Sequence, residues 1–162
     1  MNIQLLIGFL LSMSPFLELR AGLPVIVEYV LRNELNIWPY FYMVIFLNSI
    51  VTIALFLFLD LFHDKFVSYK YYKKYAMPII EKSRNEAVEV EKHFKHLGFV
   101  ALTFFVAVPI PGTGAWTGTL VAWTMGLNRV KSFIAITCGI FVAGFLVLLM
   151  SLGIFAGLYA IN

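Results

Sequence analysis

A proline- and glycine-rich interruption inside an apolar stretch constrains this chain more than any other feature. Residues 102–123, LTFFVAVPIPGTGAWTGTLVAW, are apolar enough to enter a bilayer, yet four helix-breaking residues lie within six positions: Pro109, Pro111, Gly112 and Gly114. Proline removes a backbone donor and clashes with the preceding turn, whereas glycine permits sharp turns. We therefore expect one helix to end near Val108 and another to run from Ala115 to about Met125.

Irregular backbone at membrane depth is tolerated only where it is buried in protein or faces a water-filled cavity. A structural kink in one long span is the alternative, but four clustered breakers favour the cavity. We expect Trp116 and Trp123 to pack rather than to bind a substrate. The residues of this break that are candidates for substrate binding are Pro109, Pro111, Gly112, Thr113, Gly114 and Thr117.

The first part of the chain repeats this order of elements. An apolar piece, 3–13, meets a break, SPFLELRAGLP at 14–24, and a second apolar piece follows at 25–31. In both halves a polar turn and a long apolar helix come next. Interrupted hydrophobic segments at corresponding places in two halves are typical of secondary transporters built from inverted repeats.

Composition places the chain among integral membrane proteins. It is 61% hydrophobic and 13% charged, about half the charged fraction of soluble domains. Cys138 is alone, so an intrachain disulfide is excluded, and the Cys and His spacing fits no metal site. The net charge of +3 is small, and the basic residues lie beside membrane segments. Both observations argue against a nucleic-acid partner. We expect no cofactor, and without a nucleophile–base constellation we expect no enzyme.

The pieces beside each break are shorter than the roughly 20 residues of a full span, which favours re-entrant hairpins. We predict an all-α integral membrane protein, an inverted repeat of two re-entrant helical hairpins, each followed by a transmembrane helix. The predicted organisation of the single domain 1–162 is a first repeat 1–60 (hairpin 3–33, span 38–60), a linker 61–97 with an interfacial helix, and a second repeat 98–162 (hairpin 98–126, span 132–159).

The linker sets the predicted orientation. Residues 60–97 hold eight of the twelve Lys and Arg residues and all three histidines, which we expect to be solvated. The lysine excess marks the loop 61–97 as cytoplasmic in a multi-pass protein of the cell membrane. Pro78 is expected in the first turn of a helix that runs to about His96. Basic and aromatic side chains suit an anionic leaflet surface, although a solvated linker is the simpler interpretation.

Two charged residues lie in the first break. A charge at mid-membrane costs about 2.5–3.5 kcal/mol on insertion scales, so Glu18 and Arg20 should face a cavity and pair. Arg20 is suited to a carboxylate or phosphate, and Glu18 to neutralising it or carrying a coupled proton, with Glu28 as a second acidic group. Helix N-termini expected near Ala21 and Ala115 favour anions further.

Two alternatives stay open for these residues. A minimal span over 1–17 would leave Glu18 and Arg20 in a polar loop at the membrane edge. A shallow return arm would leave Glu28 at the interface.

The motif VPIPGTGAWTGTLVAW, together with ELRAGLP in the first half, resembles the family of putative small multidrug export proteins, a family that is similar in turn to the DedA superfamily of membrane proteins. The resemblance implies two facing re-entrant loops and an inverted repeat. DedA relatives are associated with moving polyprenyl-phosphate carriers or phospholipids, and Glu18 and Arg20 match their first-loop charges. Where those proteins tend to carry an arginine after the prolines, this chain has Gly112, Thr113 and Gly114.

The expected function is a membrane transporter or flippase for an anionic amphiphile such as a lipid-linked phosphate, coupled to a proton or ion gradient. One alternative is a small multidrug exporter of cationic compounds with Glu18 as the counter-ion. Another is a non-transporting membrane scaffold. The partners are then the lipid bilayer and the amphiphile, and four apolar elements form a thin bundle that is compatible with a homodimer.

Overall fold

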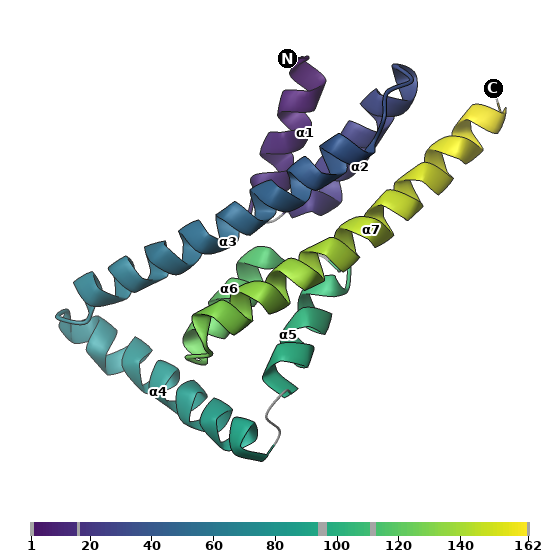
Figure 1. Cartoon of the computed structure of the whole chain (residues 1–162). Coiled ribbons are helices and arrows are strands. Elements are labelled where there is room, and N and C mark those ends of the chain that lie inside the picture. Colours follow the sequence, from purple (N-terminus) through teal and green to yellow (C-terminus); the bar gives the residue numbers. More distant parts are fainter. Residues whose placement is uncertain (1, 16, 94–96, 111–112, 162) are drawn as a thin grey trace.

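In a computed structural model of the chain, the described residues, 2–15, 17–93, 97–110 and 113–161, form an all-helical protein. Side chains at 86–93, 97 and 159–161 lie outside this description. The seven helices within the described part are α1 (Ile3–Met13), α2 (Glu18–Arg32), α3 (Trp38–Phe66), α4 (Lys70–His93), α5 (Leu97–Ala107), α6 (Ala115–Thr124) and α7 (Arg129–Ile161). Figure 1 shows α3 and α7 as two long helices, with α1, α2, α5 and α6 packed between or beside them and α4 lying against α5 and α6.

Within the described residues, two helices are long and apolar enough to cross a membrane, α3 and α7. Both exceed the predicted spans 38–60 and 132–159 at one or both ends. Their outward faces carry large exposed apolar side chains such as Phe46, Leu57 and Ile154. Polar residues on the inner face of α3, Asn48 and Thr52, are buried and each donates a hydrogen bond back to a carbonyl of its own helix.

The first break is shorter than predicted. Helix α1 ends at Met13 and α2 already begins at Glu18, so only residues 14–17 separate them. Pro24 was expected to end the break, but it lies inside α2 and removes only the backbone donor to the Arg20 carbonyl. Packing explains why the helix tolerates it, because Leu23 and Ile26 on either side are fully buried.

Close approach of glycines holds α1 against α2. A Cβ on Gly22 would overlap the carbonyl oxygen of Gly8 and would lie 2.6 Å from the Cβ of Ser12. The two helices can therefore pack along most of their length with backbone against backbone. This packing sets the direction in which the first turn of α2 projects.

The second break agrees with prediction. Helix α5 ends at Ala107, and α6 runs from Ala115 to Thr124, within one residue of the expected ends. Its two arms diverge, however, because α5 packs chiefly on α7 whereas α6 packs on both α3 and α7. Gly139 of α7 permits the contact with α5, since a Cβ there would lie 2.7 Å from Val106.

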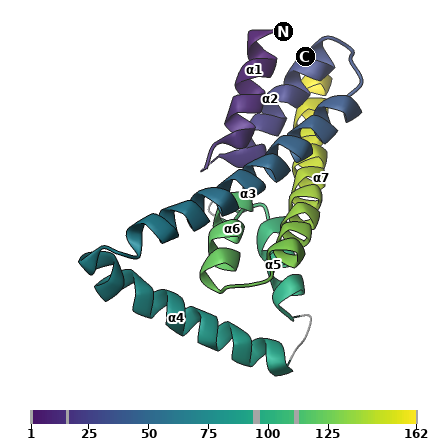
Figure 2. The same ribbon diagram turned by 60° about the vertical axis from the view of Figure 1, so that its left-hand side comes forward.

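The linker helix begins earlier than predicted. Pro78 lies within α4, not in its first turn, because α4 starts at Lys70 directly after α3. Both views show α4 crossing beneath the ends of α6 and α5 (Figures 1 and 2). His63, expected to be solvated, is half-buried, and its Nδ1 lies 2.7 Å from the Tyr72 hydroxyl. Burial raises the pKa of the Tyr72 phenol more than the nearby Arg84 lowers it, so the hydroxyl stays protonated at neutral pH.

A polar cluster anchors the C-terminal end of α6. Asp60 of α3 accepts hydrogen bonds from Trp123 Nε1 at 2.7 Å and from Arg129 Nη2 at 2.6 Å. Arg84 of α4 lies over the Trp123 ring, 5.7 Å from its centroid. Helices α3, α4 and α7 thus meet α6 at its C-terminal end.

Asp60→Asn is expected to lower the free energy of unfolding by about 1 kcal/mol, because Asp60 is half-exposed and solvent screens its ion pair. The matched control, Asp64→Asn, changes an exposed carboxylate one turn further along α3 and should cost less than about 0.5 kcal/mol. Unfolding of both variants in mixed detergent micelles measures the difference. Equal losses would show that Asp60 does not anchor α6.

Candidate functional site

The candidate site forms where the two breaks meet. The turn that ends α1 is fixed by Ser14, whose Oγ donates to the Leu11 carbonyl at 2.8 Å and accepts from the Leu17 N–H at 3.3 Å. Glu18 follows with a left-handed φ of 50°, which is uncommon for a residue with a side chain. Such backbone strain, about 1–3 kcal/mol, is found at functional sites where the surrounding structure enforces it.

The Glu18 carboxylate lies on the N-terminus of α6. Its Oε2 accepts from the Ala115 N–H at 3.2 Å and its Oε1 from the Trp116 N–H at 3.1 Å. These N–H groups have no partner within α6, and the positive end of the helix dipole adds to the attraction. Glu18 is only 6% exposed, so these bonds are what compensates its burial.

Arg20, one half-turn further along α2, binds the other side of the second break. Its Nη2 donates to the Val108 carbonyl at 2.9 Å, to the Thr113 hydroxyl at 3.1 Å and, in a short contact, to the Thr113 carbonyl. Both carbonyls lie in the second break, outside the regular helical bonding of α5 and α6, and the Val108 carbonyl also accepts from the Ile110 N–H at 2.8 Å and the Thr113 hydroxyl at 2.9 Å. Glu18 and Arg20 thus bind opposite sides of the second break.

Glycine at position 114 is required for this approach. A Cβ on Gly114 would overlap the Glu18 carboxylate, so any other residue would displace it. The backbone of Gly114 is extended, so available space rather than backbone conformation demands glycine here. We call the set Glu18, Arg20, Thr113, Gly114, Ala115 and Trp116 the break junction.

Other contacts complete the junction. Trp116, expected only to pack, donates its Nε1 to the Met13 carbonyl at 3.3 Å, at the free C-terminal end of α1. Thr117 accepts from the Gly114 N–H at 2.8 Å and so caps α6 from within its first turn. The N-terminus of α6 is therefore fixed to the ends of both α1 and α2.

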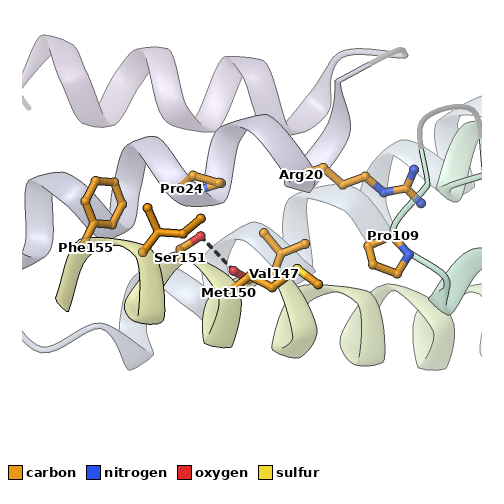
Figure 3. Close-up of a pocket in the computed structure, with 8 residues that line it drawn as sticks. Arg20, Pro24, Pro109, Val147, Met150, Ser151 and Phe155 are labelled. Carbon is orange, nitrogen blue, oxygen red and sulfur yellow. Dashed lines mark hydrogen bonds between the residues drawn. The ribbon is translucent and has the colours of Figure 1, made fainter. Parts of the chain in front are cut away.

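A groove of about 390 Å³ opens beside the junction, between α2 and α7. Figure 3 shows Arg20 and Pro109 at one end of it and Phe155 at the other. The groove is mainly apolar, and its Ser151 hydroxyl is already bonded to the Val147 carbonyl at 2.8 Å. The lining residues are Arg20, Pro24, Pro109, Val147, Met150, Ser151, Ile154 and Phe155.

The predicted site residues divide into four groups. Glu18, Arg20, Thr113 and Gly114 meet in the junction, while Pro109 lines the groove and Thr117 caps α6. Pro111 and Gly112 lie outside the described residues. Glu28 lies nearly three turns further along α2, paired with Arg32 at 2.7 Å.

Two helix N-termini were expected to favour an anion. The one expected near Ala21 is wrong, because α2 begins at Glu18. The one at Ala115 is already occupied by the Glu18 carboxylate. The sequence reasoning also missed the α7 side of the groove and the Asp60 cluster. Neither left a clear signal, because α7 reads as uniformly apolar and Asp60 lies where a span was expected to end.

Comparison with known proteins identifies the family. A family model described as "Putative small multi-drug export protein" matches residues 18–146, from the first charge of the junction to the middle of α7. No curated protein and no solved structure gives a match. The family and the two long apolar helices support a location in a membrane. Because the match covers most of its length, the chain belongs to the family of putative small multi-drug export proteins.

Proposed function

We propose that the chain is a transporter in which α1–α2 and α5–α6 are re-entrant hairpins of an inverted repeat that meet near the middle of the membrane. The observation that carries this proposal is the break junction, where a buried carboxylate and an arginine of one break bind the backbone of the other. Polar groups of this kind are costly in a bilayer and mark substrate or ion pathways. The linker then lies on the cytoplasmic side.

The substrate class we propose is an anionic amphiphile, such as a lipid-linked phosphate. Arg20 is bonded to neutral oxygens, and its Nε is buried without a partner among the described residues. A phosphate or carboxylate would replace the neutral acceptors with stronger, charge-assisted bonds. The groove would hold the apolar part, since Val147 to Phe155 spans about 12 Å of α7.

Binding of this kind would also open the junction. An anion that takes Arg20 away from the Val108 and Thr113 oxygens releases one of the two attachments between the breaks. Protonation of Glu18 would weaken the other, because a neutral carboxyl interacts less strongly with the α6 dipole. We therefore propose Glu18 as the proton-coupling group, with Glu28 as a second candidate nearer the helix end.

A second candidate is an exporter of cationic drugs, which the family description favours. Glu18 would then be the counter-ion for the drug. Arg20 nearby opposes a cation at this point, so the head-group charge of the ligand separates the two candidates.

The test uses three ligands with the same dodecyl chain and different heads: dodecyl phosphate, dodecanol and dodecyltrimethylammonium. The purified protein in nanodiscs is heated with each ligand, and the shift in unfolding is recorded. Dodecyl phosphate at a hundred times its Kd should stabilise the protein by about 2.7 kcal/mol. Dodecanol at the same concentration should stabilise it less. A larger effect of the ammonium compound would support the drug exporter instead.

Variants locate the binding. Arg20→Lys keeps the charge but loses the planar fork, so the affinity for dodecyl phosphate should fall about tenfold, or about 1.4 kcal/mol. Arg32→Lys, on the exposed end of the same helix, should leave it unchanged. Ile154→Trp should block the groove for every dodecyl ligand, since Ile154 is 62% exposed and lines it. Unchanged affinity in both Arg20→Lys and Ile154→Trp would refute the proposed site.

A further inference from the structure

Helix α4 presents two faces of different character. The inner face attaches it to the rest of the fold, through Tyr72 on His63, Arg84 on Trp123 and the buried Ile80. Next to this face, Tyr71, Tyr75 and Ile79 are 79%, 61% and 65% exposed. Their spacing of four residues places them in one row along the helix. Three large side chains in a row are therefore uncovered within the described part of the chain.

The charges around this row are mostly basic. Between residues 64 and 85 the chain carries six basic and two acidic residues. Lys70, Lys73 and Lys74 are exposed, and Lys74 Nζ lies 5.3 Å from the centroid of the Tyr75 ring. Lysines beside tyrosines match a partner with a negative surface and a layer of intermediate polarity.

The last turns of α3 carry exposed apolar and aromatic side chains. Leu57, Phe58 and Leu61 are all at least 59% exposed, which suits contact with lipid. An aromatic row, with ring centroids 4.2–5.9 Å apart, then continues through Phe62 and Phe66 to Tyr69 in the turn before α4. Helix α4 thus starts just beyond the exposed apolar and aromatic end of α3, and it runs across the bundle rather than away from it (Figure 2).

We propose that α4 lies in the headgroup layer of an anionic leaflet of the bilayer that α3 and α7 cross. Tyr71, Tyr75 and Ile79 enter the interfacial layer, and the neighbouring lysines contact lipid phosphates. Amphipathic helices with Lys and aromatic residues bind membranes in this way, with a strength that depends on anionic lipid. The proposal does not depend on the transported substrate.

The experiment places one fluorophore on α4 of the full-length protein, in a Cys138→Ser background. The labelled variants are Ile79→Cys in the exposed row and, as the matched control, Asn85→Cys, which is also exposed but about 120° away around the helix. Each is reconstituted into vesicles of phosphatidylcholine alone or with about a third phosphatidylglycerol, containing headgroup-spin-labelled lipid as quencher.

In anionic vesicles the label at position 79 should be quenched at least twofold more than the label at position 85. This ratio should fall toward one in phosphatidylcholine alone or in high salt. Equal quenching at both positions in anionic vesicles would overturn the proposal. The proposal would also be overturned if the label at position 79 were as well shielded from water in detergent as it is in vesicles. A second copy or another part of the protein would then cover the row.

Discussion

Gly114→Ala should lower the free energy of unfolding by about 3 kcal/mol. The added methyl group would occupy the position of the Glu18 carboxylate, because a Cβ at Gly114 overlaps both of its oxygens. Glu18 would have to leave the N-terminus of α6 and give up its bonds to Ala115 and Trp116. Denaturant titration in mixed detergent micelles measures the loss.

Gly153→Ala is the control for this substitution. Gly153 lies in α7 with open space around its Cβ position, so alanine there should be neutral or stabilise the helix by about 0.5–1 kcal/mol. If the two glycine variants had the same stability, Gly114 would not be in contact with Glu18.

Glu18→Gln should lower the free energy of unfolding by about 2 kcal/mol. The amide has one acceptor oxygen where the carboxylate has two, so the Ala115 and Trp116 N–H groups can no longer each have an acceptor oxygen of their own. It also loses the attraction between a negative charge and the helix dipole. A neutral side chain costs less free energy to bury, and this offsets part of the lost stability. The substitution still leaves a buried donor without an acceptor.

Glu28→Gln provides the matched comparison for Glu18→Gln. Glu28 is on the same helix, is partly exposed and forms an i,i+4 pair with Arg32, a contact worth about 0.3–0.5 kcal/mol. The loss from Glu28→Gln should therefore be several times smaller than that from Glu18→Gln. A larger loss from Glu28→Gln would mean that the Glu28 pair matters more to the fold than the junction does.

The second break could be predicted from the sequence because its cause is local. Pro109 and the glycines near it leave the backbone no regular helical route, so the ends of α5 and α6 follow from covalent geometry. The first break was predicted too long because Pro24 was given the same weight. Its effect on α2 is outweighed by buried neighbours that only the folded structure brings together.

The partners within the site could not be predicted. Glu18 was expected to pair with Arg20, yet each binds a group about 90–100 positions away in the chain. Backbone N–H groups at a helix start and carbonyls within a break leave no mark of their own in a sequence. The residue types at 18, 20 and 114 were informative, whereas their orientation required the packing of α1 on α2.

The central claim is that residues of the two breaks form one contact, and a double-mutant cycle tests it most directly. Glu18→Gln and Gly114→Ala are combined, and the free energies of unfolding of all four proteins are compared in the same micelles. If the two residues touch, the double variant should lose about 3 kcal/mol, no more than Gly114→Ala alone, because the contact can be broken only once. A loss of about 5 kcal/mol, the sum of the single effects, would contradict the account.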